Sequence, residues 1–518
     1  MAEKIDRSKM YMGVFCKSNG TWCYRIKRKV NGKVVDIEKG RFATELEAYH
    51  ERQETLRKLL SQTESVEFTD NGILFKDVFA EFLNNCHSEA SKKKYKTIYS
   101  AQLKIWDNRK VKDITDADIK VLLIKISLQG KSQSYLTSIR KVIKLIFAYA
   151  YKVYGCSKDV GQFLDTTQPR LRVLSLFSGI GAPEQALRNL DIDYELVYYC
   201  EIDKKASKAY SLLHNVPERL NLKDITDLYG ESEFVKSKYG ADILKGYENQ
   251  ILSFCRYDMP DFDLMVFGFP CQSLSKAGKN EGMGDMPSFD DSEDEEKEMQ
   301  TRSGLFWFAL EIARQKQPMF LIAENVKNLI IGHKDEFNTM LEEIDKAGYN
   351  VCYEVLNSTD FGIPQNRERV FIVMIRKDIS MKYTFPVPKP KKEINPNWLR
   401  EWLDDGVADE CYVDMSKDTN YVKALQEGYD FEHKEGYIRT ITTKWGIPSY
   451  NRQTFVKDSK GVRCLTSEEL MAFQGFQKEQ GAMLREAEFT MSDIGKLVGN
   501  SITVSVIQAV IEQLLKCM

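Results

Sequence analysis

Long apolar runs and metal-binding patterns are both missing from this sequence. No run of eighteen apolar residues occurs, and the start, Met1-Ala2-Glu3-Lys4, has no apolar signal core, so we expect a cytoplasmic protein without membrane contact. The eleven cysteines form no Cys-x-x-Cys pair, which argues against a zinc site or a disulfide framework. The five histidines have no second ligand at metal-site spacing. We therefore expect no metal.

The charge is nearly balanced overall but unevenly distributed. The formal net charge is −2, yet Lys and Arg outnumber Asp and Glu in residues 1–160, and acidic residues dominate the remainder. Such asymmetry indicates that the front part contacts a polyanion, although a solvated lysine-rich surface gives the same composition. A chain of 518 residues is also too long for one ordinary core, so two to four domains are expected.

The first 65 residues predict a small basic sheet followed by a helix. Alternating segments over 11–40 are separated by Asn19-Gly20 and Asn31-Gly32, which are strong hairpin signals. A helix over 44–60 is expected to start at a Thr44 cap, with Glu47 three residues on.

Residues 70–155 predict a helical domain with basic faces. Apolar residues recur at helical spacing, and the stretch 113–118 carries the cap of an internal helix. In pattern and order, residues 1–155 resemble the arm-type sheet and core-binding helices of phage tyrosine recombinases. No His-x-x-Arg of the recombinase catalytic domain occurs. We therefore interpret the region as a DNA-binding module and not as an enzyme.

A linker at 156–169 leads into an α/β domain over 170–518. Short apolar strands alternate with amphipathic helices, a rhythm typical of a doubly wound, largely parallel, Rossmann-like sheet. The expected strands lie near 171–177, 195–201, 263–269, 319–324, 351–356 and 369–376.

A glycine-containing turn follows the first of these strands. Ser178-Gly179-Ile180-Gly181 leads into an expected helix over 183–190, and glycines at this place allow a ligand to approach the backbone. The second strand ends at Glu201, where an acidic side chain typically binds ribose hydroxyls. The pair indicates a nucleoside-bearing cofactor.

A cysteine follows the strand near 263–269. Pro270-Cys271-Gln272 would place a thiol at the carboxyl edge of the sheet, where open α/β folds bind ligands. A single cysteine is more often a small buried hydrophobic residue. Further motifs make the chemical interpretation stronger: Glu324-Asn325-Val326, Gln365-Asn366-Arg367-Glu368-Arg369 and Gly499-Asn500-Ser501.

In this order, the motifs resemble those of the cytosine-C5 DNA methyltransferase family over residues 171–515. The resemblance implies S-adenosylmethionine as cofactor and a flipped cytosine in double-stranded DNA as substrate. Cys271, with a depressed pKa, would add to C6 of the base, because a thiolate is a good nucleophile and leaving group. Glu324 would stabilise protonated N3, and Arg369 would touch O2. Arg367 would help to brace the cysteine and the glutamate, and Asn325 would orient them.

The same resemblance implies the cofactor and DNA contacts. Recognition would lie between about 380 and 460, although an ordinary surface loop is the alternative. Asp224 competes with the nearby Asp227 for the adenine amino group. The implied cofactor residues are Phe177, Ser178, Gly179, Gly181, Glu201, Asp224, Asn500 and Ser501. The implied DNA contacts are Gln272, Arg439, Thr442 and Thr443.

The sequence departs from the family pattern in two places. An acidic insertion at 285–299 would be repelled by phosphates, so we expect it outside the groove. Ala182-Pro183 stands where a third glycine is common, which weakens the case for close backbone approach there.

Two other functions are also consistent with parts of the sequence. The tRNA-cytosine branch of the family is disfavoured because its Cys-Phe-Thr element is missing. A non-catalytic DNA-binding regulator would need a damaged active site. We expect a monomer in a prophage, mobile-element or restriction context. A cognate restriction endonuclease would be its partner in the restriction context, but the sequence does not reveal whether such a partner exists. Removing 1–160 should spare methylation of short duplexes while weakening DNA affinity.

Overall fold

The computed structural model describes most of the two larger regions and part of the amino-terminal one. The described residues are 14–17, 21–30, 33–42, 48, 51–52, 55, 72–86, 88–155, 170–225, 259–270, 305–388, 396–417, 419, 422–423, 425–426, 431, 433, 435–443 and 454–518.

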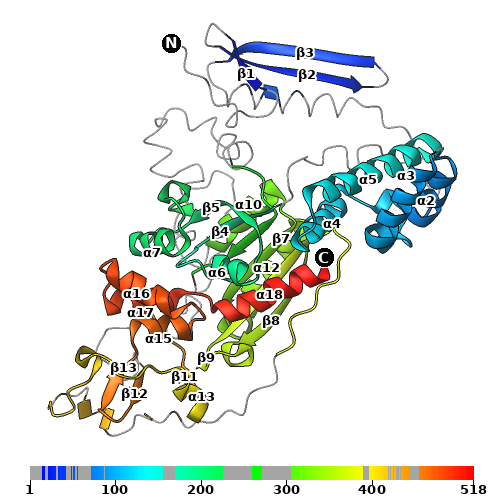
Figure 1. The fold of residues 1–518 in the computed structure, drawn as a ribbon. Coiled ribbons are helices and arrows are strands. Elements are labelled where there is room, and N and C mark those ends of the chain that lie inside the picture. The colour runs from blue at the N-terminus through cyan, green and yellow to red at the C-terminus, as the bar shows by residue number, and fades with distance from the viewer. Residues whose placement is uncertain are drawn as a thin grey trace.

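The amino-terminal region contains a three-stranded antiparallel sheet (Figure 1). Its strands are β1 (Val14–Cys16), β2 (Trp22–Val30) and β3 (Lys33–Phe42), in that spatial order. Tyr24 and Ile26 are buried and Arg25 between them is exposed, as the alternation of a strand requires. The two predicted hairpins are therefore confirmed. The predicted helix over 44–60 falls largely outside the described residues, although Ala48, Glu51, Arg52 and Thr55 have helical conformation.

The helical region folds around its own apolar core, which includes Phe75, Trp106, Leu122 and Phe147. It comprises α2 (Phe75–Asn84), α3 (Glu89–Ile98), α4 (Asp116–Leu128) and α5 (Gln133–Tyr154). The predicted internal cap is confirmed, because the Thr115 hydroxyl accepts a hydrogen bond from the Asp118 N–H, and the Asp118 carboxylate accepts one from the Thr115 N–H.

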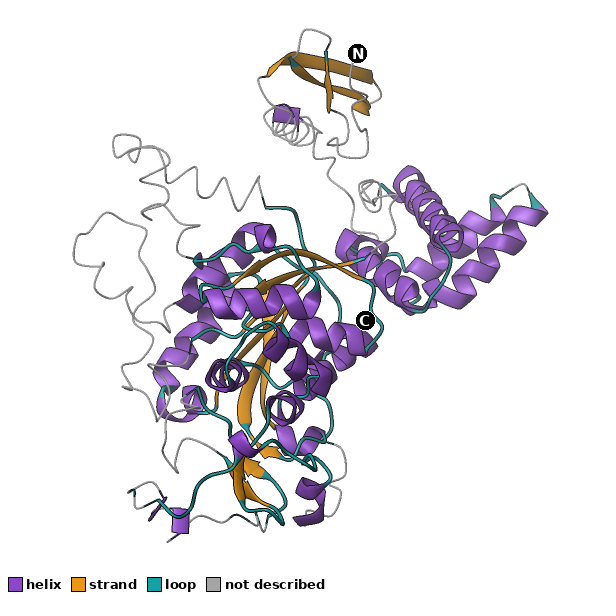
Figure 2. Cartoon of the chain, turned by 60° about the vertical axis from the view of Figure 1, so that its left-hand side comes forward, coloured by secondary structure: helices purple, strands orange, loops and turns teal. Residues whose placement is uncertain are grey.

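A mixed six-stranded sheet forms the centre of the largest region (Figure 2). Its order is β5 (Tyr194–Cys200), β4 (Leu171–Leu176), β6 (Leu264–Phe267), β7 (Phe320–Val326), β10 (Glu368–Arg376) and β8 (Tyr349–Asn357). The first four strands are parallel, and β10 runs antiparallel to both of its neighbours. All six predicted strands are present, and their ends differ from the prediction by no more than a few residues. The doubly wound prediction is thus confirmed, with one strand reversed.

Helices cover both faces of this sheet. Val173, Val266, Ile322 and Val373 face α6 (Ala182–Asn189), α7 (Lys204–His214) and α18 (Val504–Cys517). The alternate residues Leu174, Met265, Leu321 and Met374 face α10 (Leu305–Lys316) and α12 (Lys334–Lys346). Strands buried on both faces are the reason why the sequence reads as continuous apolar runs instead of alternation.

Helix α4 docks onto the amino edge of the sheet. Its residues Ala117, Val121 and Ile124 belong to the same apolar cluster as β4 and β6. Lys120 forms an ion pair with Asp263, a buried carboxylate directly before β6, and Arg172 donates its N–H to Asp263 at 3.0 Å. Because β10 is reversed, its end reaches the same edge, and Thr115 donates to the Asp378 carbonyl at 3.3 Å. The helical region is therefore packed against the α/β region by apolar, ionic and hydrogen-bond contacts.

Further small elements lie toward the opposite edge of the sheet, and most of them come from the carboxyl-terminal part of the chain. These elements are α11 (Asn328–Gly332), β9 (Gln365–Asn366), α13 (Pro396–Arg400), β11 (Ile438–Arg439), β12 (Phe455–Lys457), β13 (Val462–Cys464), α15 (Ser467–Phe473), α16 (Lys478–Glu486) and α17 (Met491–Asn500). Among the described residues, Met491–Cys517 is the one stretch long and apolar enough for a membrane span. It consists of two helices, and 72% of its apolar window is buried inside the protein, as in a core helix.

Candidate active site

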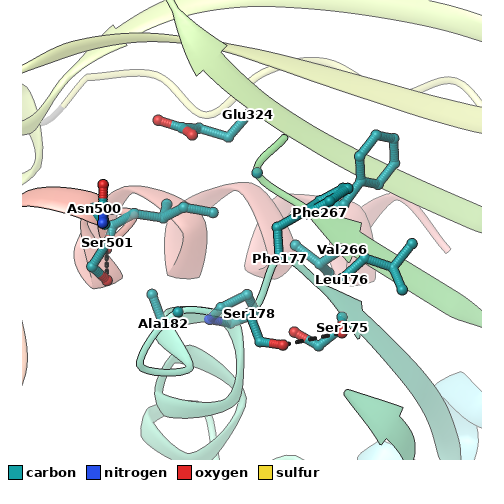
Figure 3. Close-up of a pocket in the computed structure, with 14 residues that line it drawn as sticks. Ser175, Leu176, Phe177, Ser178, Ala182, Val266, Phe267, Glu324, Asn500 and Ser501 are labelled. Atoms are coloured by element: carbon teal, nitrogen blue, oxygen red, sulfur yellow. Dashed lines mark hydrogen bonds between the residues drawn. The ribbon is translucent and has the colours of Figure 1, made fainter. Parts of the chain in front are cut away.

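A cavity that is partly open to solvent lies at the carboxyl edge of the central sheet (Figure 3). β4 has β5 on one side and β6 on the other, so the winding of the chain reverses at β4. Open α/β sheets bind ligands outside such a reversal point. The cavity is lined by residues 175–179 at the end of β4 and just beyond it, and by residues 266–268 at the end of β6. Glu324 near the end of β7, residues 500–502, and Ala182 and Pro183 of α6 complete the lining.

The turn after β4 has an unusual backbone. Phe177, Gly179 and Gly181 have φ of 52°, 55° and 76°, a region that favours glycine. A Cβ on Gly179 would meet no atom within 4 Å, so the Gly179 backbone borders open space. A Cβ on Gly181 would lie 2.1 Å from Nε2 of His214. Gly181 is therefore needed for packing under the turn and does not line the cavity as described.

Ser178 and Glu201 join the ends of β4 and β5. The Ser178 hydroxyl donates to the Cys200 carbonyl at 3.0 Å, and the Cys200 N–H donates back to that hydroxyl. The Glu201 carboxylate accepts from the N–H groups of Gly179 and Asp203, both at 2.8 Å. Burial raises the pKa of Glu201, and these N–H groups oppose the rise. The hydroxyl of Ser178 thus serves the fold, while Glu201 is fixed beside the turn.

Asn221 is a positioning residue that the sequence motifs did not reveal. Its amide accepts from the Glu201 N–H at 3.0 Å and donates to the Glu201 carbonyl at 2.9 Å. It also accepts from the Lys223 N–H at 2.8 Å. Asn221 therefore holds the segment that contains Asp224 next to Glu201. Asp224 itself does not line the cavity.

Glu324 and Arg369 meet at the ends of two adjacent strands. Arg369 Nε lies 3.1 Å from Glu324 Oε1, but the two groups are not aligned for a hydrogen bond. Oε1 has no hydrogen-bond donor among the described residues, although the side chain is almost entirely buried. Burial raises the pKa of Glu324, and the positive charges of Arg369 and Arg367 partly offset this rise. A buried acceptor at the cavity wall without a donor is suited to a polar ligand.

Asn325 links the end of β7 to the turn after β6. Its Nδ2 donates to the Phe269 carbonyl at 3.1 Å, and its Oδ1 accepts from the Val326 N–H at 2.8 Å. Phe269 stands two residues before Cys271. Cys271 and Gln272, like the acidic insertion at 285–299, lie outside the described residues. Asn325 thus holds the backbone from which the predicted nucleophile follows.

Arg367 makes contacts that the resemblance did not imply. Its guanidinium donates to the carbonyls of Ile441 at 3.1 Å, Gly499 at 3.1 Å and Ser501 at 2.8 Å. Its influence on Glu324 is electrostatic. Instead of bracing Glu324 by a hydrogen bond, Arg367 supports the chain at Asn500 and Ser501, both of which line the cavity.

The predicted DNA contacts that the structure describes lie on the surface. Arg439, Thr442 and Thr443 are exposed in and after the short strand β11. The buried Ile438 and Ile441 anchor this stretch to the core. The neighbouring residues 444–453 lie outside the described part of the chain.

Comparison with known proteins places residues 171–516 in one family. The model for the C-5 cytosine-specific DNA methylases matches this range. The type II methyltransferase M.Bsp6I of Bacillus sp. (strain RFL6) is 31% identical over 365 residues, which are 67% of this chain and 99% of that protein.

Other similar proteins include phage enzymes and a solved structure. The orphan methyltransferase M.SPRI of Bacillus phage SPR is 35% identical over 282 residues, and this chain spans 55% of its length. For the orphan methyltransferase M.Rho11sI of Bacillus phage rho11s, the spanned share is 48%. The crystal structure of S. pombe Dnmt2 methyltransferase aligns with a TM-score of 0.48 and 19% identity, covering 67% of this chain and 99% of that one. By the match over 171–516, this chain belongs to the C-5 cytosine-specific DNA methylase family.

Proposed function

We propose that this chain is an S-adenosylmethionine-dependent DNA (cytosine-5-)-methyltransferase. The observation that carries the proposal is the convergence, at one edge of the sheet, of three features. They are the glycine turn after β4, the buried Glu324 with its partly buried partner Arg369, and the segment Phe269–Pro270 that leads into Cys271.

The residues around the cavity fit S-adenosylmethionine. The open backbone at Gly179 allows close approach, the ring of Phe177 offers a stacking surface for adenine, and Glu201 is fixed beside the turn for ribose hydroxyls. Asn500 and Ser501 close the other wall, and Asp224 is the proposed partner of the adenine amino group. When bound, this cofactor supplies an electrophilic methyl group.

The chain's own residues would make cytosine C5 nucleophilic. The Cys271 thiolate would form a bond from sulfur to C6, and the ring electrons would move to C5. C5 would thereby become nucleophilic toward the methyl group that the cofactor would supply, whose bond to the donor sulfur would break as the new bond to C5 forms. Glu324, protonated at a raised pKa, donates to N3 as charge develops there, and Arg369 faces O2. Loss of the C5 proton to solvent, return of the N3 proton to Glu324 and cleavage of the S–C6 bond would restore the aromatic ring and free the thiolate.

The substrate would be a cytosine flipped out of duplex DNA, because a paired base cannot reach a cavity at the end of β7. Arg439, Thr442 and Thr443 are proposed to read base edges in the major groove, with Gln272 near the flipped base. The exposed lysines Lys93, Lys94, Lys96, Lys141 and Lys144 of α3 and α5 are proposed to contact phosphates. They belong to the region docked at the opposite edge of the sheet, so they would bind DNA away from the target base.

The cellular setting follows from the same proposal. Because several similar proteins are phage orphan or type II methyltransferases, we propose an intracellular monomer of prophage or restriction–modification origin. A cognate restriction endonuclease is the proposed partner in the second case.

The test is transfer of tritiated methyl groups from S-adenosylmethionine to duplex DNA and, separately, to tRNA. We expect label in DNA, at cytosines that bisulfite sequencing of an expressing host identifies. Label in tRNA alone would assign the RNA branch of the family. Retained DNA binding with no transfer to either substrate would instead indicate a binding protein.

A further inference from the structure

We infer that Arg367 is a positioning residue that couples DNA recognition to cofactor binding. It would do so by joining the recognition segment, residues 438–443, to the cavity wall, residues 499–502. The inference rests on the proposed function and deepens it, because it assigns a regulatory contact to the same site.

Arg367 hydrogen-bonds main-chain carbonyls from two different segments. Arg367 is 4% exposed, yet its guanidinium hydrogen-bonds three main-chain carbonyls. Ile441 belongs to the recognition segment, Ser501 lines the cavity, and Gly499 directly precedes the lining residue Asn500. One rigid, planar group therefore holds two segments that are far apart in sequence.

Two buried glutamines close the same network. Gln365 Oε1 accepts from the Ile441 N–H at 3.0 Å, and its Nε2 donates to Gln474 Oε1 at 3.1 Å. The Gln474 Nε2 in turn donates to the Ser501 carbonyl. Both glutamines have no exposed surface. A second chain of hydrogen bonds thus runs from Ile441 to Ser501, parallel to that through Arg367.

The two segments also touch directly. A Cβ added to Gly499 would lie 2.5 Å from the carbonyl carbon of Thr442 and 2.6 Å from the nitrogen of Thr443. Only glycine permits this approach, because no real Cβ comes so close to a backbone atom. A displacement of the recognition segment therefore displaces the wall, and the reverse also holds.

The hydrogen-bond network of Arg367, Gln365 and Gln474 lies between the protein surface and the cavity. Arg439, Thr442 and Thr443 are exposed on the recognition side, while Asn500, Ser501 and Ile502 line the cavity. The recognition segment pairs with β9 over only two residues, so its order depends on these side-chain contacts. A ligand that orders one side lowers the entropic cost of ordering the other, and linkage makes the effect reciprocal.

The experiment measures this coupling without turnover. Affinity for S-adenosylhomocysteine is determined by calorimetry with and without a 30-base-pair duplex carrying the site identified by bisulfite sequencing. For the wild-type chain we expect DNA to tighten binding by about fivefold or more. In Arg367→Met, the ratio of the affinity with DNA to the affinity without DNA should fall to nearly one. Arg367→Lys keeps the positive charge but loses the planar guanidinium, so it should retain part of the coupling.

Two milder variants test the same coupling in case the Arg367 variants fail to fold. Thr440 Oγ1 donates to the Asn366 carbonyl at 2.6 Å, which tethers the recognition segment without touching the cavity. Thr440→Val should weaken the coupling. Thr339→Val removes a comparable bond, to the Asp335 carbonyl at 3.1 Å in α12, and should leave the coupling intact.

An unchanged ratio in folded Arg367→Met and in Thr440→Val would overturn the inference. This outcome differs from failure of the proposed function, in which the wild-type chain itself would bind no S-adenosylhomocysteine or transfer no methyl group.

Discussion

At the residue scale, Glu324 is held between opposing influences. Burial raises its pKa, whereas Arg369 and Arg367 lower it. The protonated carboxyl therefore persists above the ordinary range, which suits a group that donates to N3. The resemblance assigned Glu324 and Arg369 to the same base, but their misaligned ion pair depends on strand register and could not be predicted from the motifs.

This balance predicts a shift in the pH profile. Activity that needs protonated Glu324 declines as pH rises through its pKa, so Glu324 should set the alkaline limb of kcat/KM. Arg369→Gln removes a positive charge that lowers this pKa, so the limb should move to higher pH while the rate falls. A limb that stays in place when measured on short duplexes would refute the assignment.

Glu184 is a second buried carboxyl, in helix α6 directly after the glycine turn that follows β4. It is fully buried in α6, its oxygens have no aligned hydrogen bond among the described residues, and burial raises its pKa. The ring of His214 packs against that of Tyr210, and burial lowers the pKa of this imidazole to about 4, which keeps it neutral.

Glu184 should therefore make stability depend on pH. The folded state binds the proton more tightly than the unfolded state, so wild-type stability should fall as pH rises above about 4.5 and through the folded-state pKa. Glu184→Gln should remove this loss. The free energy of unfolding of the variant, relative to that of wild type, should therefore be higher at pH 8 than at pH 5. Urea unfolding at both values tests this, with the exposed Glu195→Gln as control. Equal pH dependence of wild type and Glu184→Gln would show that Glu184 does not titrate in this way.

At the scale of elements, local rules predicted strands and caps well. The six strands were found because both faces are buried, and the α4 cap because Thr115 and Asp118 have the spacing of a capping box. The contacts of Gln365, Arg367 and Asn221 were missed, since each depends on segments that only tertiary folding brings together. The motif Gln365-Asn366-Arg367 indicated that the residues matter but not which carbonyls they bind.

A buried ion pair joins β13 to the start of α15. Arg463 forms a two-point ion pair with Glu469 at 2.8 and 2.9 Å, and both side chains are almost completely buried. Arg463→Leu leaves the Glu469 charge buried without its partner, so unfolding should become easier by about 3–5 kcal/mol. Thermal denaturation measures the loss, and the double variant with Glu469→Leu should recover part of it. A double variant no more stable than the single one would contradict this account.

At the scale of the whole molecule, the docking of α4 changes one expectation. The charge pattern suggested a separable DNA-binding module, so that removing 1–160 should spare methylation of short duplexes. The packing of Ala117, Val121 and Ile124 into the α/β core shows instead that this deletion exposes apolar surface. Sequence could not reveal this, because α4 is buried nearly all round and carries no distinct docking motif.

Two truncations separate the regions. Deleting 1–71 should leave the melting temperature and methylation of short duplexes unchanged. Deleting 1–160 should lower the melting temperature, because Asp263 loses Lys120 and the sheet edge loses its cover. Lys120→Met should reproduce part of that loss, and the exposed Lys104→Met should not. Equal melting temperatures for both truncations would mean that the docking contributes nothing to stability.

The central claim, that Cys271 attacks the ring of a flipped cytosine, is tested most directly by covalent trapping. A duplex with 5-fluorocytosine at the target position cannot lose a proton from C5, so the enzyme–DNA bond should persist. With S-adenosylmethionine present, the account predicts a denaturant-resistant complex for the wild-type chain and none for Cys271→Ala. Methyl transfer to the normal duplex without any trapped complex on the fluorinated one would contradict it.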